Sequence, residues 1–251
     1  KNCDKEAKIW GNPSALENPF EKKGKGNNLP PNISMMNAIG SDEVGTGDYF
    51  GPVTVVASYV KNEQIEQLKQ LGVQDSKHLT DKKIIEIGRE IKEMIPFSLL
   101  TLHNKKYNEL QKAGMSQGKM KALLHNQAIG HVLKKIAPEK PDIIIIDEFV
   151  KEELYFRHLI GEKSIHRENV VFSTKGESVH LSVAASSILA RYAFLQHMDK
   201  LSEKAGFPLP KGAGPKVDEA AAKLIRAKGK EVLPYFVKLH FANTDKALKL
   251  V

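Results

Sequence analysis

Four carboxylates interrupt or follow segments that otherwise suit a protein core. Asp42 and Glu43 lie near the end of a predicted strand, and Asp147 directly follows four consecutive isoleucines. Glu177 precedes a long predicted helix, and the dipole at a helix N-terminus stabilises a nearby negative charge. Because acidic residues are poor strand formers, these positions are candidates for chemistry rather than for packing.

The chemistry that such residues would do is metal-dependent phosphodiester cleavage. Carboxylates that meet at close range raise one another's pKa unless a cation neutralises them. Mg²⁺ binds carboxylate oxygens together with substrate phosphate and water, and two such ions roughly 4 Å apart serve many nucleases. Taken singly, each acidic residue is better explained by a surface salt bridge. Adjacent strand residues also point to opposite faces, so Asp42 and Glu43 share a site only if the strand twists or ends there.

The elements that must position these side chains follow from periodicity and turn residues. The strands are predicted at residues 38–44, 53–60, 97–102, 142–147 and 169–173. The helices are predicted at residues 63–71, 81–94, 105–112, 118–136, 152–160, 179–201, 217–228 and 243–250. This order indicates an α/β fold with a mixed central sheet flanked by helices and a helical C-terminal extension. If strands 38–44 and 142–147 are parallel neighbours, Asp42 and Asp147 converge beyond their carboxyl ends.

A glycine-rich segment, Gly-Thr-Gly-Asp-Tyr-Phe-Gly-Pro at residues 45–52, follows the first carboxylate pair. It fails the dinucleotide-binding pattern, because its third glycine is one place late and a strand rather than a helix follows. Its backbone could instead approach a ribose 2′-hydroxyl, the group that distinguishes RNA from DNA. Gly45, Thr46 and Gly47 are therefore candidate substrate contacts, and a plain hairpin turn is the alternative.

Composition points to a polyanionic partner and away from membranes. The chain has 38 Lys and Arg against 30 Asp and Glu, a formal charge of +8. No apolar run approaches the roughly 20 residues that a membrane helix needs. With Cys3 as the single cysteine, neither an intrachain disulfide nor a cysteine-based zinc site is possible. We therefore expect a monomer in a reducing, cytoplasmic location.

The N-terminal stretch differs in composition from the rest of the chain. Residues 1–36 are polar and rich in Gly, Pro and Lys, which is typical of a linker. We therefore predict a linker, or the tail of a preceding domain, over residues 1–36. The catalytic domain is predicted over residues 37–251.

Several motifs, met in order, resemble the type 2/3 ribonucleases H. Residues 42–52 are similar to the opening motif of that family, and Asp75-Ser76-Lys77 is similar to its basic substrate-contact segment. Asp147 matches the third acidic position and Lys175-Gly176-Glu177 the fourth, just before the small-residue helix at residues 183–191. The resemblance extends from about residue 38 to the C-terminus.

Details within these motifs favour the type 3 branch, bacterial ribonuclease HIII. Residues 45–47 are Gly-Thr-Gly, where type 2 enzymes usually carry Gly-Arg-Gly, and Glu177 stands where type 2 usually has Asp. Residues 124–126 and 209–214 are also similar to type 3. Type 3 members usually carry an N-terminal substrate-binding domain, of which residues 1–36 would be only the tail.

The resemblance implies a ribonuclease H-like fold and hydrolysis of the RNA strand of RNA–DNA hybrids, leaving 5′-phosphate and 3′-hydroxyl ends. It implies two Mg²⁺ or Mn²⁺ ions on Asp42, Glu43, Asp147 and Glu177. Ser76 and Lys77 are expected to contact substrate. Ser116, which opens a helix whose N-terminus could hold phosphate, and Ser187 are further candidates. Two alternatives remain: a type 2 enzyme that cuts at single ribonucleotides in duplex DNA, and a nucleic-acid-binding module without catalysis.

Overall fold

The computed structural model of the chain describes residues 29–251, so residues 1–28 of the predicted linker lie outside the described part. The first described element is a short 3-10 helix, η2 (Ile33–Met35). Its Ile33 is buried in a cluster with Ile143 and Val183. The end of the predicted linker therefore packs against the body of the protein, while the domain division at residue 37 stays a prediction.

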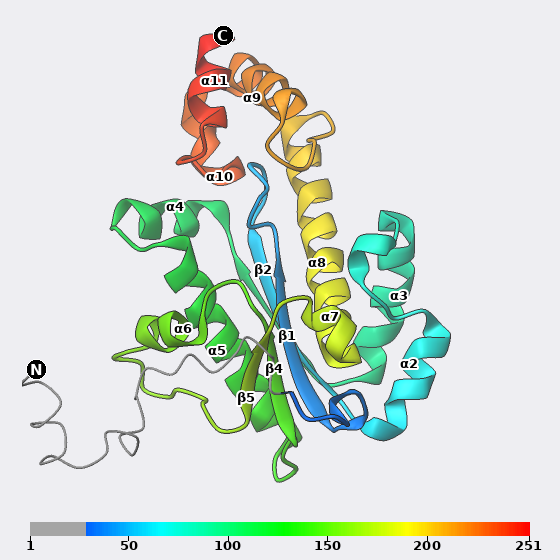
Figure 1. The fold of residues 1–251 in the computed structure, drawn as a ribbon. Coiled ribbons are helices and arrows are strands. Elements are labelled where there is room, and N and C mark those ends of the chain that lie inside the picture. Colours follow the sequence, from blue (N-terminus) through cyan, green and yellow to red (C-terminus); the bar gives the residue numbers. More distant parts are fainter. Residues whose placement is uncertain (1–28) are drawn as a thin grey trace, which may run out of the picture.

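A five-stranded mixed sheet forms the centre of the fold (Figure 1). Its strands are β1 (Ala38–Val44), β2 (Val53–Val60), β3 (Phe97–Leu102), β4 (Ile143–Asp147) and β5 (Val170–Ser173), in the order β3-β2-β1-β4-β5. β1 pairs antiparallel with β2 and parallel with β4. The prediction of an α/β fold with a mixed sheet is confirmed, and so is the parallel pair that brings Asp42 towards Asp147.

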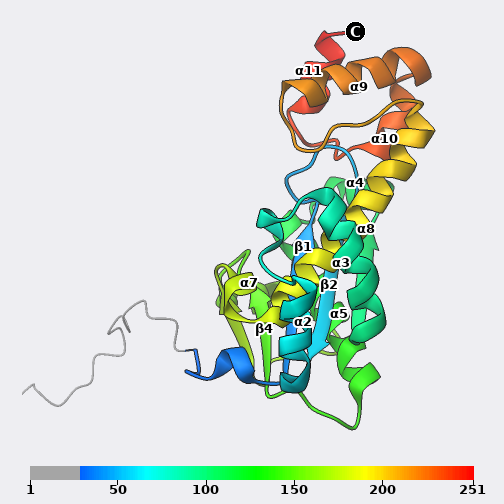
Figure 2. The same ribbon diagram turned by 90° about the vertical axis from the view of Figure 1, so that its right-hand side faces the viewer.

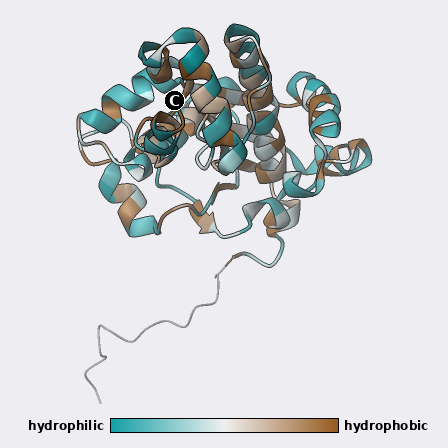
Figure 3. Ribbon diagram, turned by 90° about the horizontal axis from the view of Figure 1, so that it is seen from above, coloured by the Kyte–Doolittle hydropathy of each residue, from teal (hydrophilic) through white to brown (hydrophobic). Residues whose placement is uncertain are grey.

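Helices cover both faces of this sheet (Figures 1 and 3). The apolar side chains between the layers form the core. One face carries α2 (Ile65–Leu71), α3 (Asp81–Met94) and α8 (Leu181–Ala205). The other face carries α5 (Gln117–Ile136) and α6 (Glu152–His158). Near them, α4 (Asn104–Lys112) follows β3.

A group of helices forms a C-terminal extension beyond one end of the sheet (Figures 1 and 2). It comprises α9 (Pro215–Lys228), η5 (Lys230–Val232), α10 (Leu233–Phe236) and α11 (Asn243–Lys249). Its apolar core includes Tyr49 and Phe50 from the glycine-rich segment. The extension therefore packs directly on the connection between β1 and β2.

The long helix α8 lies unusually close to β1. A Cβ atom on Gly40 would be 2.2 Å from the backbone nitrogen of Val183, so only glycine fits there. The Ser186 hydroxyl donates to the carbonyl of Gly40 at 2.9 Å, which fixes the helix across the strand. Because Ser187 follows Ser186 on this helix, the contact also brings Ser187 towards the strand that carries Asp42.

The helix predicted at residues 179–201 corresponds to α8, which begins two residues later and extends to Ala205. A short helix, α7 (Gly176–Val179), precedes α8, and extended backbone at His180 separates the two. The break arises because the His180 ring caps α8, with Nδ1 accepting from the Ser182 N–H at 2.9 Å. Glu177 lies within the first turn of α7, the short helix ahead of α8. Among residues 29–251, no helix has the length and apolar character that a membrane span requires.

Candidate active site

The predicted carboxylates gather at the carboxyl ends of β1 and β4. The parallel register pairs Ser41 with Ile146, so Asp42 and Asp147 are the next residues on adjacent strands. Asp42 is buried, and its Oδ1 accepts from the Glu43 N–H at 2.7 Å. Burial and the charges of Glu43 and Asp147 raise the pKa of Asp42 well above its usual value, against a hydrogen bond from Ser187.

Glu43 points away from Asp42, towards α5, as the alternation of a strand requires. Its Oε1 lies 2.7 Å from the Lys121 Nζ, and its Oε2 lies 3.0 Å from the His125 Nε2. Burial alone would raise the pKa of Glu43, but the hydrogen bonds and charges of His125 and Lys121 lower it to about 2. His125 is fully buried and also lies 2.7 Å from the Ser41 hydroxyl, so it is a hydrogen-bonded histidine that holds Glu43.

Glu177 reaches the same region from α7. Its Oε2 accepts from the Ser76 N–H at 2.6 Å, and its Oε1 lies 3.6 Å from the Lys77 Nζ. The carboxylate is buried, and burial raises its pKa. The 3-10 helix that carries both partners, η4 (Ser76–His78), is held by Arg191, which donates to the Ser76 carbonyl at 2.5 Å.

Asp147 is half-buried at the end of β4. The Gly176 N–H donates to its Oδ1 at 2.8 Å, because a left-handed Lys175 turns the chain back from β5 towards β4. Burial raises the pKa of Asp147, and the charge of Glu43 adds to this effect. Each of the four carboxylates is thus oriented by a hydrogen bond or an ion pair from the protein itself.

The donor set fits a hard divalent cation. Across residues 29–251, no three His, Cys, Asp or Glu side chains are already arranged as a set of metal ligands. However, burial raises the pKa of Asp42, and the charges of Glu43, Asp147 and Glu177 add to this effect, so the other three carboxylates act on Asp42. Mg²⁺ and Mn²⁺ bind to carboxylate oxygens whose negative charge is not neutralised by nearby basic side chains.

Of the predicted substrate contacts, Ser76 and Lys77 contact Glu177, and they differ in exposure. Lys77 has a largely exposed side chain, whereas Ser76 and Ser187 are buried, with their hydroxyls 2.9 Å apart. Ser116 caps α5 by accepting from the Lys119 N–H at 3.2 Å. The Ser116 hydroxyl oxygen is therefore already used to cap the N-terminus of this helix.

The glycine loop, residues 45–51, lies beside the start of α5, where Gln117 donates to the Thr46 carbonyl at 3.2 Å. Gly45 has φ of 95° and its Cβ would be 2.1 Å from the Pro52 carbonyl oxygen, so glycine is required. Nothing lies within 4 Å of a Cβ built on Gly47, which faces open space. The Thr46 hydroxyl is the one buried side-chain polar atom in residues 29–251 that lacks a hydrogen-bond partner.

Comparison with known proteins agrees with this geometry. The family described as Ribonuclease HII matches residues 39–244. The ribonuclease HIII of Bacillus cereus is 60% identical over 222 residues, which is 88% of this chain and 71% of the relative. The chain belongs to the type 2/3 ribonuclease H family. It is therefore a hydrolytic nuclease, of the class that cuts the RNA strand of RNA–DNA hybrids.

Two further relatives of this ribonuclease cover much of the chain. The ribonuclease HIII of Bacillus licheniformis is 54% identical, and the match covers the whole chain and 81% of the relative. The crystal structure of Bst-RNase HIII in complex with Mn²⁺ has 54% sequence identity and a TM-score of 0.85. That match covers 87% of this chain and 71% of the solved one.

Some residues that build the ribonuclease site were not predicted. Lys121 is one of them. The signal that could have indicated it is its position four residues before His125, which places both side chains on the same face of a helix. Lys238 and Asn104, which support the glycine loop, carry no signal in the sequence because they reach the loop through tertiary structure.

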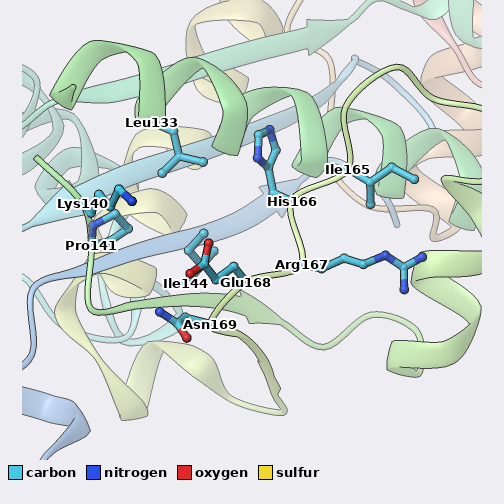
Figure 4. Close-up of a pocket in the computed structure, with 9 residues that line it drawn as sticks. All are labelled: Leu133, Lys140, Pro141, Ile144, Ile165, His166, Arg167, Glu168 and Asn169. Carbon is cyan, nitrogen blue, oxygen red and sulfur yellow. The ribbon is translucent and has the colours of Figure 1, made fainter. Parts of the chain in front are cut away.

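A cavity elsewhere in the ribonuclease contains none of the predicted site residues (Figure 4). It lies between α5, the beginning of β4 and the segment before β5, and Ile144 and His166 are among the residues that line it. Ile144 is at the opposite end of β4 from Asp147. The cavity is therefore separate from the carboxylates.

Proposed function

We propose that this chain hydrolyses the RNA strand of RNA–DNA hybrids with two divalent ions, Mg²⁺ or Mn²⁺, held by Asp42, Glu43, Asp147 and Glu177. The products would carry 5′-phosphate and 3′-hydroxyl ends. The observation that carries the proposal is that Asp42, Asp147 and Glu177 come from β1, β4 and α7 to one region and all have raised pKa values. Glu43 adjoins Asp42 in β1, although its side chain is paired with Lys121 and His125 of α5. A relative with 54% identity was solved with Mn²⁺, which supports the choice of metal.

The protein's own residues hold the four ligands in place for this reaction. Ser187 and the Glu43 N–H orient Asp42, while the Gly176 N–H orients Asp147. Bound divalent ions would activate the attacking water and stabilise the leaving oxygen. A histidine base is therefore not required, and His125 is assigned the role of orienting Glu43.

We assign substrate binding to the exposed groups around the carboxylates. Lys77 can contact a backbone phosphate, and Gly47 can approach a ribose closely because nothing covers it. Ser116 at the start of α5 remains a candidate phosphate contact. The burial of Ser76 and Ser187 favours an orienting role for both. We further propose a monomer that acts in the cytoplasm on extended hybrids.

The test is cleavage of an end-labelled RNA–DNA hybrid with Mg²⁺, Mn²⁺ or EDTA, beside a DNA duplex that contains one ribonucleotide. Metal-dependent cutting of the hybrid, with little cutting of the second duplex, supports the proposal. Strong cutting at the single ribonucleotide would indicate a type 2 preference instead. Binding without cleavage in either metal would indicate a nucleic-acid-binding module.

A further inference from the structure

Lys238 is a fully buried lysine in the C-terminal extension, between α10 and α11. Its Nζ donates to the carbonyls of Asp48 and Gly51, both at 2.7 Å. Its backbone N–H donates to the carbonyl of Tyr49 at 2.9 Å. One residue therefore contacts three carbonyls in the second half of the glycine loop.

Other contacts fix the same side of the loop to the extension. The Gly51 N–H donates to the Phe236 carbonyl at 3.0 Å, and Phe50 forms a bridge with Val237. From α4, Asn104 Nδ2 donates to the Gly51 carbonyl at 2.8 Å. The rear of the loop is thus held by the extension and α4, while Gly47 at its front is open.

The burial of a charged group here needs a reason. Lys238 lies beside Tyr49, Phe50 and Val237, which are buried apolar side chains. Burying an ammonium group is costly, and a well-packed apolar side chain of similar size would often be at least as stable. What an apolar side chain could not supply is two hydrogen-bond donors aimed at the loop carbonyls.

The charged and titratable groups around Lys238 offset little of the cost of burying its positive charge. Burial lowers the pKa of Lys238 to about 7, and the charge of Asp48 opposes this effect. The Asp48 carboxylate itself accepts from the Gly212 N–H at 2.5 Å. The Tyr107 ring of α4 lies 5.8 Å from the Nζ, and His240 is two residues further along the chain. The two carbonyls are thus the nearest hydrogen-bonded partners of the ammonium.

We propose that Lys238 is a positioning residue that sets the shape of the glycine loop for the hybrid and couples the C-terminal extension to substrate binding. The inference rests on the proposed function, because contact between the loop and the hybrid is part of that proposal. Lys238 does not touch the four carboxylates, so its removal acts on binding and leaves the chemical step intact.

The first experiment compares Lys238→Met with the wild type in hybrid cleavage. Methionine keeps the length and apolar bulk of the side chain but removes both donors. KM for the hybrid is expected to rise about tenfold, the effect of losing hydrogen bonds worth roughly 1.4 kcal/mol, while kcat stays within about twofold. Lys249→Met, on the exposed face of the same extension, is the matched control and should change neither value.

The second experiment measures the loop itself by amide hydrogen exchange. Exchange within residues 45–51 should be faster in Lys238→Met than in the wild type, with the sheet unchanged. Asn104→Ala removes another donor to the Gly51 carbonyl and should also raise KM. It replaces Lys238→Met as the test if that variant fails to fold. An unchanged KM and an unchanged exchange rate would overturn the inference. Loss of wild-type cleavage would instead overturn the proposed function.

Discussion

At the scale of the residue, the four carboxylates differ in what neutralises them. Glu43 has two basic partners, Lys121 and His125, and its pKa is low. Asp42 accepts hydrogen bonds but has no basic partner within the described residues, and its pKa is raised. A divalent cation would therefore have its largest electrostatic effect next to Asp42 and Asp147, at the ends of the two parallel strands.

The first residue-scale prediction concerns Asp147. Asp147→Asn removes one negative charge and one metal ligand but keeps the shape of the side chain. Turnover of the hybrid should fall by at least about a thousandfold, equivalent to roughly 4 kcal/mol of transition-state stabilisation, while hybrid binding stays within a fewfold of the wild type. Cleavage assays and a binding titration check both parts. Asp199→Asn, at an exposed position on α8, is the matched control, and near wild-type turnover in Asp147→Asn would refute the site.

The second prediction links metal binding to pH. Asp42, Asp147 and Glu177 have raised pKa values, so in the metal-free protein they destabilise the fold at neutral pH, and this cost declines as pH falls. Glu43, whose pKa is lowered to about 2, contributes stability above its ordinary pKa of 4.5 and loses it as pH falls towards 2. Metal ions need the ionised carboxylates, so protons compete with them at low pH.

The increase in Tm with saturating Mg²⁺ or Mn²⁺ should consequently be larger at pH 8 than at pH 5. At one hundred times Kd, the metal would stabilise the fold by about 2.7 kcal/mol. Thermal unfolding with metal and with EDTA at both pH values measures this difference. Asp42→Asn should lose most of the increase, and an equal increase at both pH values would contradict the assignment of these ligands.

The sequence alone was sufficient to identify the four acidic candidates, because acidic residues at strand and helix ends are conspicuous. It could not supply their partners. Lys121 is 78 positions from Glu43, and Lys238 is 187 positions from Gly51, so only the folded chain brings them together. Burial was equally hidden: Ser76 and Ser187 could be singled out, but not the fact that they face each other inside the protein.

At the scale of the element, the contact between β1 and α8 holds the site together. β1 carries Asp42, and α8 carries Ser187 and Arg191, which orient Asp42 and the Ser76 carbonyl respectively. Gly40 allows this contact because it has no side chain. Any change that separates the two elements should therefore disturb both stability and metal binding.

Gly40→Ala is the element-scale prediction. The new Cβ would overlap the backbone of Val183 and Ser182, which cannot move aside as a flexible side chain could. The free energy of unfolding should fall by roughly 3 kcal/mol, as expected for strong overpacking. Denaturant unfolding measures the change. Gly47→Ala, where a Cβ meets no atom within 4 Å, should change stability by less than about 0.5 kcal/mol, and equal losses in both variants would contradict the argument.

Most elements could be predicted from periodicity, since α3 and β3 have the bounds expected from the sequence. The exception with functional weight is the division between α7 and α8. The helix predicted at residues 179–201 matches α8, but the separate short helix α7 before it was not predicted, and α8 begins at the cap formed by His180. Capping by histidine is uncommon, so the pattern of apolar residues gave no sign of it.

At the scale of the whole molecule, the chain spans 71–81% of the length of the Bacillus relatives described above. Its net charge of +8 arises from 38 Lys and Arg against 30 Asp and Glu. Lys77 is distinctive because its ammonium stands beside Glu177 with most of its side chain exposed. Its role is either to neutralise that carboxylate or to bind a phosphate.

The salt dependence of hybrid binding separates these two roles. Each phosphate that is neutralised contributes about −0.9 to the slope of log K against log salt, so hybrid affinity should fall more than tenfold between 50 and 200 mM salt if about three phosphates are contacted. In Lys77→Met the slope should become shallower by about 0.9, whereas Lys249→Met should leave it unchanged. If the slope of Lys77→Met matches that of the wild type, Lys77 serves Glu177 alone. The phosphate contacts must then come from other basic residues around the carboxylates, with Lys119 beside Ser116 as the next to test.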